Sequence, residues 1–184
     1  MPLSLTAPPA QEPVTLARAK AHLKVDTADD DALIGALITA ARARAEWHTG
    51  RALVTQGWTL HLDAWPCSGI VEIPLPPLQG VSAVTLYARD DTPSVLDLAR
   101  YTVDAASAPA RLALTAAPPA GLRPLNGIAI AFTAGYGDAD AVPALLQEAI
   151  LALVTFLYEN RGEAPAELPP ACLALLAPFR VLKL

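Results

Sequence analysis

The 184-residue sequence has few of the residues from which metal and redox sites are usually built. It contains two cysteines and three histidines, and aromatic residues make up only 5% of it. Cys67 and Cys172 lie far apart and lack metal-ligand spacing, so we expect free thiols rather than a disulfide framework. The histidines, His22, His48 and His61, do not share the i, i+4 spacing of a helical metal site, so no metal ligand is predicted.

The sequence also lacks a cluster of lysine and arginine residues. Its formal net charge is −5, with 13 basic and 18 acidic residues. Proteins that bind nucleic acid in a groove normally carry a basic patch or stripe. The composition therefore argues against direct, tight binding of nucleic acid, although it allows DNA to pass nearby.

Long hydrophobic runs are missing as well. The longest one, residues 149–158, is interrupted by Thr155, and it is too short for a bilayer, which needs roughly 20 residues. Residues 1–9 have no charged start and no apolar core of useful length, so no secretory signal peptide is expected. We expect a soluble protein without a membrane partner.

Catalytic motifs are absent too. No serine lies in a Gly-x-Ser-x-Gly elbow, and neither cysteine has the local signature of a nucleophile. Gly135-Tyr-Gly137 precedes a predicted helix but lacks the full phosphate-binding pattern, and Asp138 and Asp140 would repel an anion. The acidic run 26–31 lacks the ligand pattern of an EF-hand and is typical of an acidic helix start. We therefore predict no catalytic, metal-binding or cofactor-binding residues and no cofactor.

The strongest pattern in the chain is a long apolar helix that follows a β-type run. Residues 128–133 alternate like a strand and end in a glycine turn. Pro143 suits the first position of the helix, and Gly162 suits the position just past its end. The apolar residues between them recur at helical spacing and predict a mostly buried central helix. They are Leu145, Leu146, Ala149, Ile150, Leu153, Val154, Leu157 and Tyr158.

Two further helices are predicted near the N-terminus. The first covers 16–23 with Thr15 as its N-cap, and the second covers 29–49 with Gly50 as its stop signal. The second is amphipathic, with Trp47 at the boundary between its faces. Its predicted core face holds Leu33, Ile34, Leu37, Ile38, Ala41, Ala45 and His48. The opposite face, free for water or a neighbour, holds Gly35, Thr39, Arg42, Glu46 and Thr49.

Between these helices the hydrophobic period changes to two, which is typical of strands. The β-type segments are 53–62, 70–75, 81–87, 94–103, 111–115 and 128–133, with Pro74 confining 70–75 to an edge or a bend. The sequence thus predicts a single α+β domain, a helical frame with a β-rich insertion. Its parts are a flexible or extended arm (1–13), the frame (14–50 and 142–177), the insertion (51–137) and a C-terminal tail (178–184).

The tail follows a short helix predicted over 171–177 and stopped by Pro178. Two basic residues interleave four apolar ones along it: Phe179, Arg180, Val181, Leu182, Lys183 and Leu184. The residues leave two alternatives open. The tail folds back on its own core, or it docks on a partner.

The order of several short motifs resembles the phage head–tail connector (adaptor) family, which occurs in long-tailed phages, prophages and gene transfer agents. The resemblance runs from about residue 14 to the end of the chain. The motifs are Val14-Thr-Leu-Ala with Lys20 and His22-Leu23, Asp29-Asp-Asp-Ala-Leu-Ile34, Thr49-Gly-Arg51, Ile73-Pro-Leu-Pro-Pro-Leu-Gln-Gly-Val81, Phe132-Thr-Ala-Gly-Tyr-Gly137, Val142-Pro and Tyr158-Glu-Asn-Arg161.

This resemblance implies a structural protein and not an enzyme. Family members form a ring, commonly a dodecamer, under the portal at the head–tail junction of a particle assembled in the host cytoplasm. DNA passes through the ring's channel without specific binding, and a stopper or tail protein meets its other side. The resemblance also implies that the tail, Phe179 to Leu184, binds the portal.

Two other classes of function remain open from the residues alone. One is a monomeric protein-binding module, which size measurements would separate from a ring-forming subunit. The other is a small hydrolase whose site is assembled from scattered carboxylates and histidines, which a pocket with strongly shifted pKa values would favour.

Overall fold

A computed structural model of the chain describes residues 2–160 and 167–181. Within them it forms four α-helices and two antiparallel β-sheets, which confirms the predicted α+β class. The chain packs as two compact units. The β unit comprises the described residues of Met1–Ala10 and Thr55–Gly135, and the helical unit those of Gln11–Val54 and Tyr136–Leu184. That the whole chain acts as one adaptor domain stays a prediction.

The larger sheet of the β unit has five strands in the order β1-β2-β8-β4-β5. Its centre is held by aliphatic residues that meet in register. Ile130 of β8 pairs with Leu60 of β2 on one side and with Val84 of β4 on the other, and all three side chains are buried. Such cross-strand neighbours are the main source of sheet stability. The strands are β1 (Leu3–Ala7), β2 (Gln56–Leu62), β4 (Leu78–Tyr87), β5 (Pro93–Val95) and β8 (Ile128–Ala134).

The smaller sheet has three strands in the order β3-β7-β6, comprising β3 (Ile70–Ile73), β7 (Ala110–Leu114) and β6 (Tyr101–Asp104). β3 is an edge strand, as Pro74 predicted, because proline cannot donate to a second neighbour. Val71 and Ile73 are buried while Ile70 and Glu72 are exposed, so one face of this strand carries the apolar contacts. A short 3₁₀ helix, η1 (Leu98–Arg100), divides the predicted segment 94–103 into β5 and β6.

The N-terminal arm, for which a flexible or extended segment was predicted, is extended over Leu3–Ala7. Leu3–Ala7 forms strand β1, which pairs antiparallel with β2, with Leu3 opposite Leu60 and Leu5 opposite Trp58. Prolines of the arm lie outside the paired residues. Their restricted backbone therefore limits the strand without preventing it.

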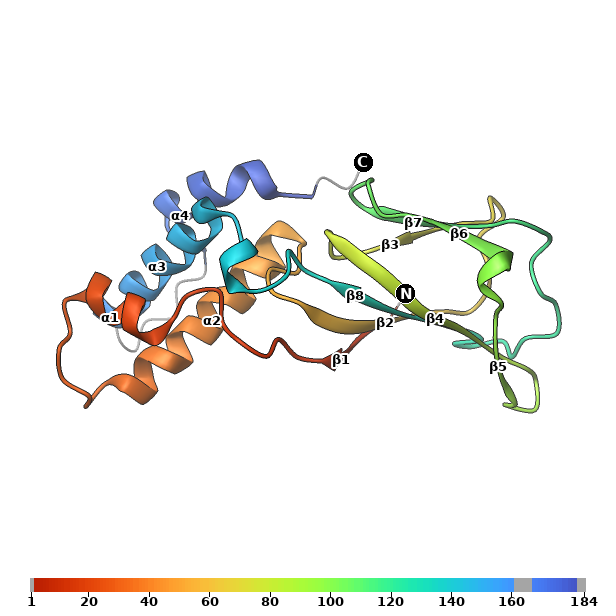
Figure 1. The fold of residues 1–184 in the computed structure, drawn as a ribbon, viewed down its shortest axis with the longest axis horizontal. Helices are drawn as coiled ribbons and strands as arrows, with labels where there is room; N and C mark the ends of the chain where they lie inside the picture. The colour runs from red at the N-terminus through yellow and green to blue at the C-terminus, as the bar shows by residue number, and fades with distance from the viewer. Residues whose placement is uncertain (1, 161–166, 182–184) are drawn as a thin grey trace. The chain divides into compact units, whose positions relative to one another are not determined.

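The helical unit contains α1 (Leu16–Leu23), α2 (Asp31–Thr49), α3 (Ala144–Glu159) and α4 (Pro170–Leu176), with 3₁₀ helices η2 (Ala139–Ala141) and η3 (Ala177–Phe179). Figure 1 shows α1, α2 and α3 packed against one another. Thr15 caps α1 as predicted, because its Oγ1 accepts a hydrogen bond from the backbone N–H of Arg18 at 3.2 Å. Gly50 ends α2 in the left-handed conformation with φ of 69°, which glycine adopts without a Cβ penalty.

The long helix α3 is the centre of the helical core, as the sequence predicted. Its buried side chains are Leu146, Ala149, Ile150, Leu151, Leu153 and Val154, and they pack with Ile34 and Ile38 of α2 and with Cys172 and Leu176 of α4. Leu145, by contrast, is 48% exposed, so its expected place in the apolar stripe was wrong. The helix ends at Glu159, and the predicted stop residue Gly162 lies outside the described residues.

The faces of α2 differ from the prediction. Arg42 and Thr49, expected on the free face, are buried, while Leu33, expected in the core, is 37% exposed. Thr49 is accommodated because its Oγ1 donates a hydrogen bond to the carbonyl of Ala45 at 2.7 Å. Trp47, expected at the boundary, is 85% exposed.

At the C-terminal end, the short helix predicted over 171–177 is present as α4, which ends at Leu176, before Pro178. Pro178 lies in the 3₁₀ turn η3, which directly follows α4. A proline is tolerated there because the first positions of a helix need no N–H partner. Among the described residues, no helix combines the length and the apolar character needed to cross a membrane.

The packing of α3 leads to a first prediction. Leu153→Ala should lower the free energy of unfolding by about 2–5 kcal/mol, because it removes apolar contacts and leaves a cavity in the core. Leu153 is 1% exposed, whereas Leu145 on the same helix is 48% exposed and provides the matched control, Leu145→Ala. Denaturant unfolding of both variants measures the difference. If both variants lost the same free energy of unfolding, the assignment of Leu153 to the buried face of α3 would be wrong.

Candidate interaction site

The side chains that could ligate a metal are dispersed over the described residues. These residues contain no group of three or more His, Cys, Asp and Glu side chains that could hold a metal ion. The histidines are dispersed, with His22 on α1, His48 on α2 and His61 on β2. Cys67 is an exposed free thiol and Cys172 a buried one, and burial raises the pKa of Cys172.

The acidic segment before α2 has structural partners. Asp31 accepts a hydrogen bond from the ammonium group of Lys20 on α1, and Asp30 accepts one from the hydroxyl of Tyr158 on α3. Both contacts join the start of α2 to its neighbours. The structure therefore agrees with an acidic helix start rather than a cation loop.

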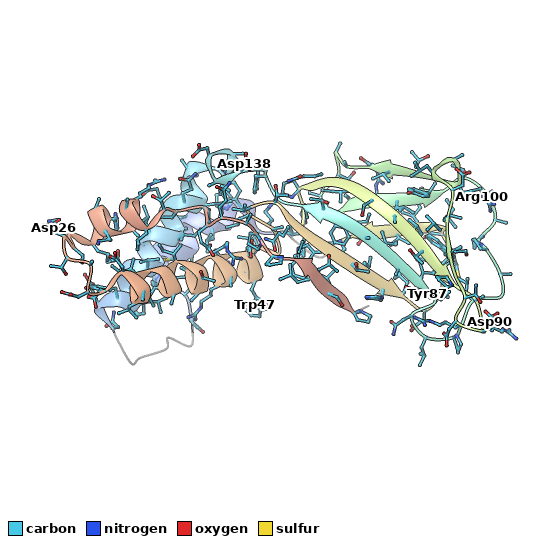
Figure 2. The ribbon with its side chains drawn as sticks, turned by 60° about the horizontal axis from the view of Figure 1, so that its bottom comes forward. Asp26, Trp47, Tyr87, Asp90, Arg100 and Asp138 are labelled. Atoms are coloured by element: carbon cyan, nitrogen blue, oxygen red, sulfur yellow. The ribbon has the colours of Figure 1, made fainter. Side chains whose placement is uncertain are left out.

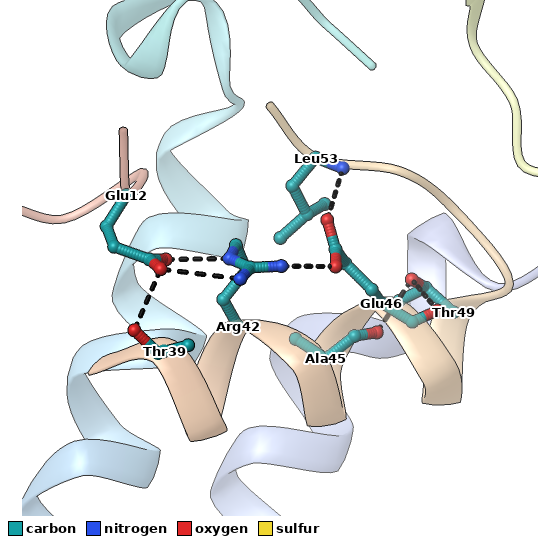
Figure 3. Close-up of polar contacts among 7 residues, drawn as sticks. All are labelled: Glu12, Thr39, Arg42, Ala45, Glu46, Thr49 and Leu53. Carbon is teal, nitrogen blue, oxygen red and sulfur yellow. Dashed lines mark hydrogen bonds and ion pairs between the residues drawn. The ribbon is translucent and has the colours of Figure 1, made fainter. Parts of the chain in front are cut away.

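A polar cluster around Arg42 connects several segments of the helical unit (Figure 3). The guanidinium donates from Nε to Oε2 of Glu12 at 2.7 Å and from Nη1 to Oε2 of Glu46 at 2.8 Å. Thr39 donates from its hydroxyl to Oε1 of Glu12 at 2.9 Å, and the N–H of Leu53 donates to Oε1 of Glu46 at 2.9 Å. One arginine thus joins the segment before α1, helix α2 and the segment after it.

Burial makes these contacts necessary. The side chain of Arg42 is only 11% exposed, and those of Glu12 and Glu46 are 28% and 14% exposed. Burial acts to lower the pKa of Arg42, but hydrogen bonds and charge attraction from the two glutamates outweigh it and raise that pKa above its usual value. Arg42 is therefore a permanent cation with two carboxylate partners, and removing it would leave both carboxylates poorly compensated.

The end of α2 also receives the beginning of the C-terminal tail. The backbone N–H of Val181 donates to the carbonyl of Thr49 at 2.8 Å, and Nε of Arg51 donates to the carbonyl of Phe179 at 2.5 Å. A Cβ built on Gly50 would lie 3.6 Å from Cβ of Val181, so the two backbones are close.

Of the six predicted portal-binding residues, the structure brings three to one place. Phe179 packs partly buried against the helical core, Arg180 is exposed, and Val181 is held at Thr49. Leu182, Lys183 and Leu184 lie outside the described residues. The fold-back alternative thus holds for the first part of the tail, and its binding of a partner stays a prediction.

The sequence interpretation missed the Arg42 cluster. Arg42 and Glu46 have the i, i+4 spacing of a helical ion pair, which was a usable signal. Glu12 is far away in the sequence, in a segment expected to be flexible, and nothing in the local pattern connects it to Arg42.

The cluster yields a second prediction. Arg42→Ala should lower the free energy of unfolding by about 3 kcal/mol, near the lower end for a broken buried pair because Glu12 keeps some access to water. The control is Arg18→Ala. Arg18 binds Glu148 at 2.6 Å, but both side chains are nearly half exposed, so the loss should stay within about 1 kcal/mol. Urea unfolding compares the two variants, and similar losses would show that the cluster contributes no more than a surface pair.

Comparison with known proteins identifies the family and the fold of the chain. The model of the phage gp6-like head–tail connector protein family matches residues 13–167. A search of curated proteins finds no match. Solved structures do match the whole chain. The neck of an empty GTA particle, computed with C6 symmetry, contains a chain that is 27% identical with a TM-score of 0.86, and the alignment covers 100% of this chain and 97% of that one.

Two further structures agree over the same share of both chains. A chain in the virion of the native gene transfer agent (GTA) particle is 25% identical with a TM-score of 0.85. A chain in the neck of the native GTA particle, computed with C12 symmetry, is 28% identical with a TM-score of 0.82. The fold is therefore that of a particle neck protein over its full length.

The chain has the α+β fold of a particle neck protein, and its polar residues connect its own segments. It is a structural subunit of an assembly. The chain belongs to the phage gp6-like head–tail connector family. It is a structural connector subunit of the head–tail junction, as the resemblance implied.

Proposed function

We propose that this connector acts as a ring of twelve copies beneath the portal, that a stopper or tail protein meets its other side, and that DNA passes through its channel. The observation that carries the proposal is the full-length match to a chain in a neck computed with C12 symmetry. The C6 symmetry used for the neck of the empty particle is also compatible with twelve subunits. Assembly in the host cytoplasm and the absence of a catalytic role belong to the same proposal.

The charge of the chain supports this passive relation to DNA. Affinity for the phosphate backbone grows with the number of lysine and arginine side chains that neutralise phosphates. A subunit with a formal net charge of −5 supplies few free cations, and Arg42 and Arg111 are already engaged with carboxylates. A channel of such subunits lets the polymer slide without holding it.

The C-terminal tail is the proposed portal contact. Its first residues are attached to the end of α2 through Thr49 and Arg51, so the chain that continues beyond Val181 starts from a defined point. Apolar side chains interleaved with two basic ones suit an extended segment that adds to the edge of a partner's sheet. We therefore propose that Leu182, Lys183 and Leu184 recognise the portal. Phe179 and Val181 attach the tail to the end of α2.

Two truncations test this division. Deleting residues 182–184 should leave the melting temperature unchanged and give filled heads without tails. Deleting 179–184 should give the same heads and also lower the melting temperature, because it removes the hydrogen bonds at Thr49 and Arg51. Thermal unfolding and electron microscopy of particles provide the readouts. If particles that carry the connector without residues 182–184 still attach tails normally, the proposed contact between the C-terminal tail and the portal is wrong.

A mass measurement on particles with complete necks tests the ring itself. Twelve connector copies at each junction are expected, and a monomeric binding module would give one or two. This count is independent of the truncations, so the ring and the portal contact can fail separately.

A further inference from the structure

The outward surface of α2 is apolar, although it faces water in the isolated chain. The structure describes all of α2, and Thr39 is the only polar residue among its exposed positions. The other exposed positions are Ala32, Leu33, Ala36, Ala40, Ala43 and Trp47. We call Leu33, Ala36, Ala40, Ala43 and Trp47 the α2 stripe. Its members follow one another at alternating spacings of three and four residues, and they therefore form one line along the helix.

This distribution reverses the usual one. A helix on the surface of a protein normally turns its charged residues to water and its apolar stripe to the core. Here Arg42 is buried, and it holds both Glu12 and Glu46. Arg42, Glu46 and Thr49 are thus engaged inside the helical unit. Arg44 and His48 are half-buried, and mostly alanine occupies the exposed positions.

Trp47 is the most exposed large apolar residue of the described chain, at 85%. Figure 2 shows its side chain pointing away from the helix bundle. Tryptophan is enriched among the few residues that dominate binding energy in interfaces. The alanines beside it offer little obstruction, so a neighbouring helix could approach to about 8 Å, the short end of helix packing distances.

We propose that the α2 stripe is where a second copy of this chain docks in the connector ring, with Trp47 as the anchor. This rests on the proposed function. Identical copies related by the C12 symmetry of the similar neck are the partners that must cover each other's surfaces. Contacts between identical subunits are also more apolar and poorer in charge than transient ones, which matches the stripe.

Ring symmetry further restricts what the stripe touches. Two stripes facing each other would form a two-fold contact, which closes a dimer and not a ring. A cyclic ring needs a head-to-tail contact between two different surfaces. The stripe of one copy therefore docks on a surface of the next copy that lies outside residues 31–49.

Site-specific photo-crosslinking in assembled particles tests the proposal. Trp47 is replaced by the photoreactive residue p-benzoylphenylalanine, which keeps an aromatic group and does not involve the two cysteines. After illumination, mass spectrometry identifies the linked chain. The expected product is a connector dimer in which position 47 is joined to a residue of a second copy outside 31–49. A link to the portal, to a tail protein or between two copies of position 47 would overturn the proposal, and so would the absence of any link between chains.

A charge introduced into the stripe gives a second measurement. Ala43→Arg should leave the melting temperature unchanged, because Ala43 is exposed, and should lower connector incorporation into particles at least about tenfold, as for loss of an interface hot spot. The control, Ala21→Arg, adds the same charge at an exposed position of α1 and should assemble normally. Normal incorporation of Ala43→Arg, or an equal defect in the control, would overturn the proposal.

The copy number in the same wild-type particles separates the two levels of inference. Twelve copies with crosslinks to another protein would leave the ring standing and reject the α2 stripe as its contact. One or two copies at each junction would reject the ring and the stripe together.

Discussion

The helical unit depends on the pairing of Arg42 with Glu12 and Glu46. A guanidinium that is 11% exposed is stable only with charged partners and with its hydrogen-bond donors engaged. This requirement holds the segment before α1 at α2, and Glu46 in turn receives the N–H of Leu53. Since Thr49 and Arg51 hold the first residues of the tail, the N-terminal segment and the beginning of the C-terminal tail are both attached to the second half of α2 and the residues that follow it.

The same pairing determines what α2 presents to its surroundings. Arg42 and Thr49 occupy buried positions of α2, and this sets which side of the helix is exposed. The exposed positions carry alanine, Leu33, Trp47 and a single polar residue, Thr39. The buried ion pairs thus position the helix for assembly as well as stabilising the subunit. Such a use of internal polar groups suits a protein whose work is to be joined to copies of itself and to other proteins.

A connector acts through contacts with other proteins rather than through a pocket of its own. Several of its charged side chains are engaged in contacts between its own segments: Lys20 with Asp31, Arg111 with Asp104, and Arg123 with Asp91. What remains available is extended surface, namely sheet edges, a helix face and a C-terminal segment. These are features from which contacts between proteins are built.

The sequence by itself determined the four helices and most of the strands of the described residues, and the family. Thr15, Gly50 and Pro143 mark helix ends through local backbone chemistry, and the spacing of Leu146, Ile150, Leu153 and Val154 identifies the buried face of α3 because helical periodicity is a local property. The tertiary structure alone decided which segments meet. Pairing of Leu3–Ala7 with β2 and of Glu12 with Arg42 joins residues far apart in the chain, and no local pattern encodes such contacts. It also decided the rotation of α2, since hydrophobicity alone places Arg42 in water, and only a partner carboxylate from another segment makes its burial favourable.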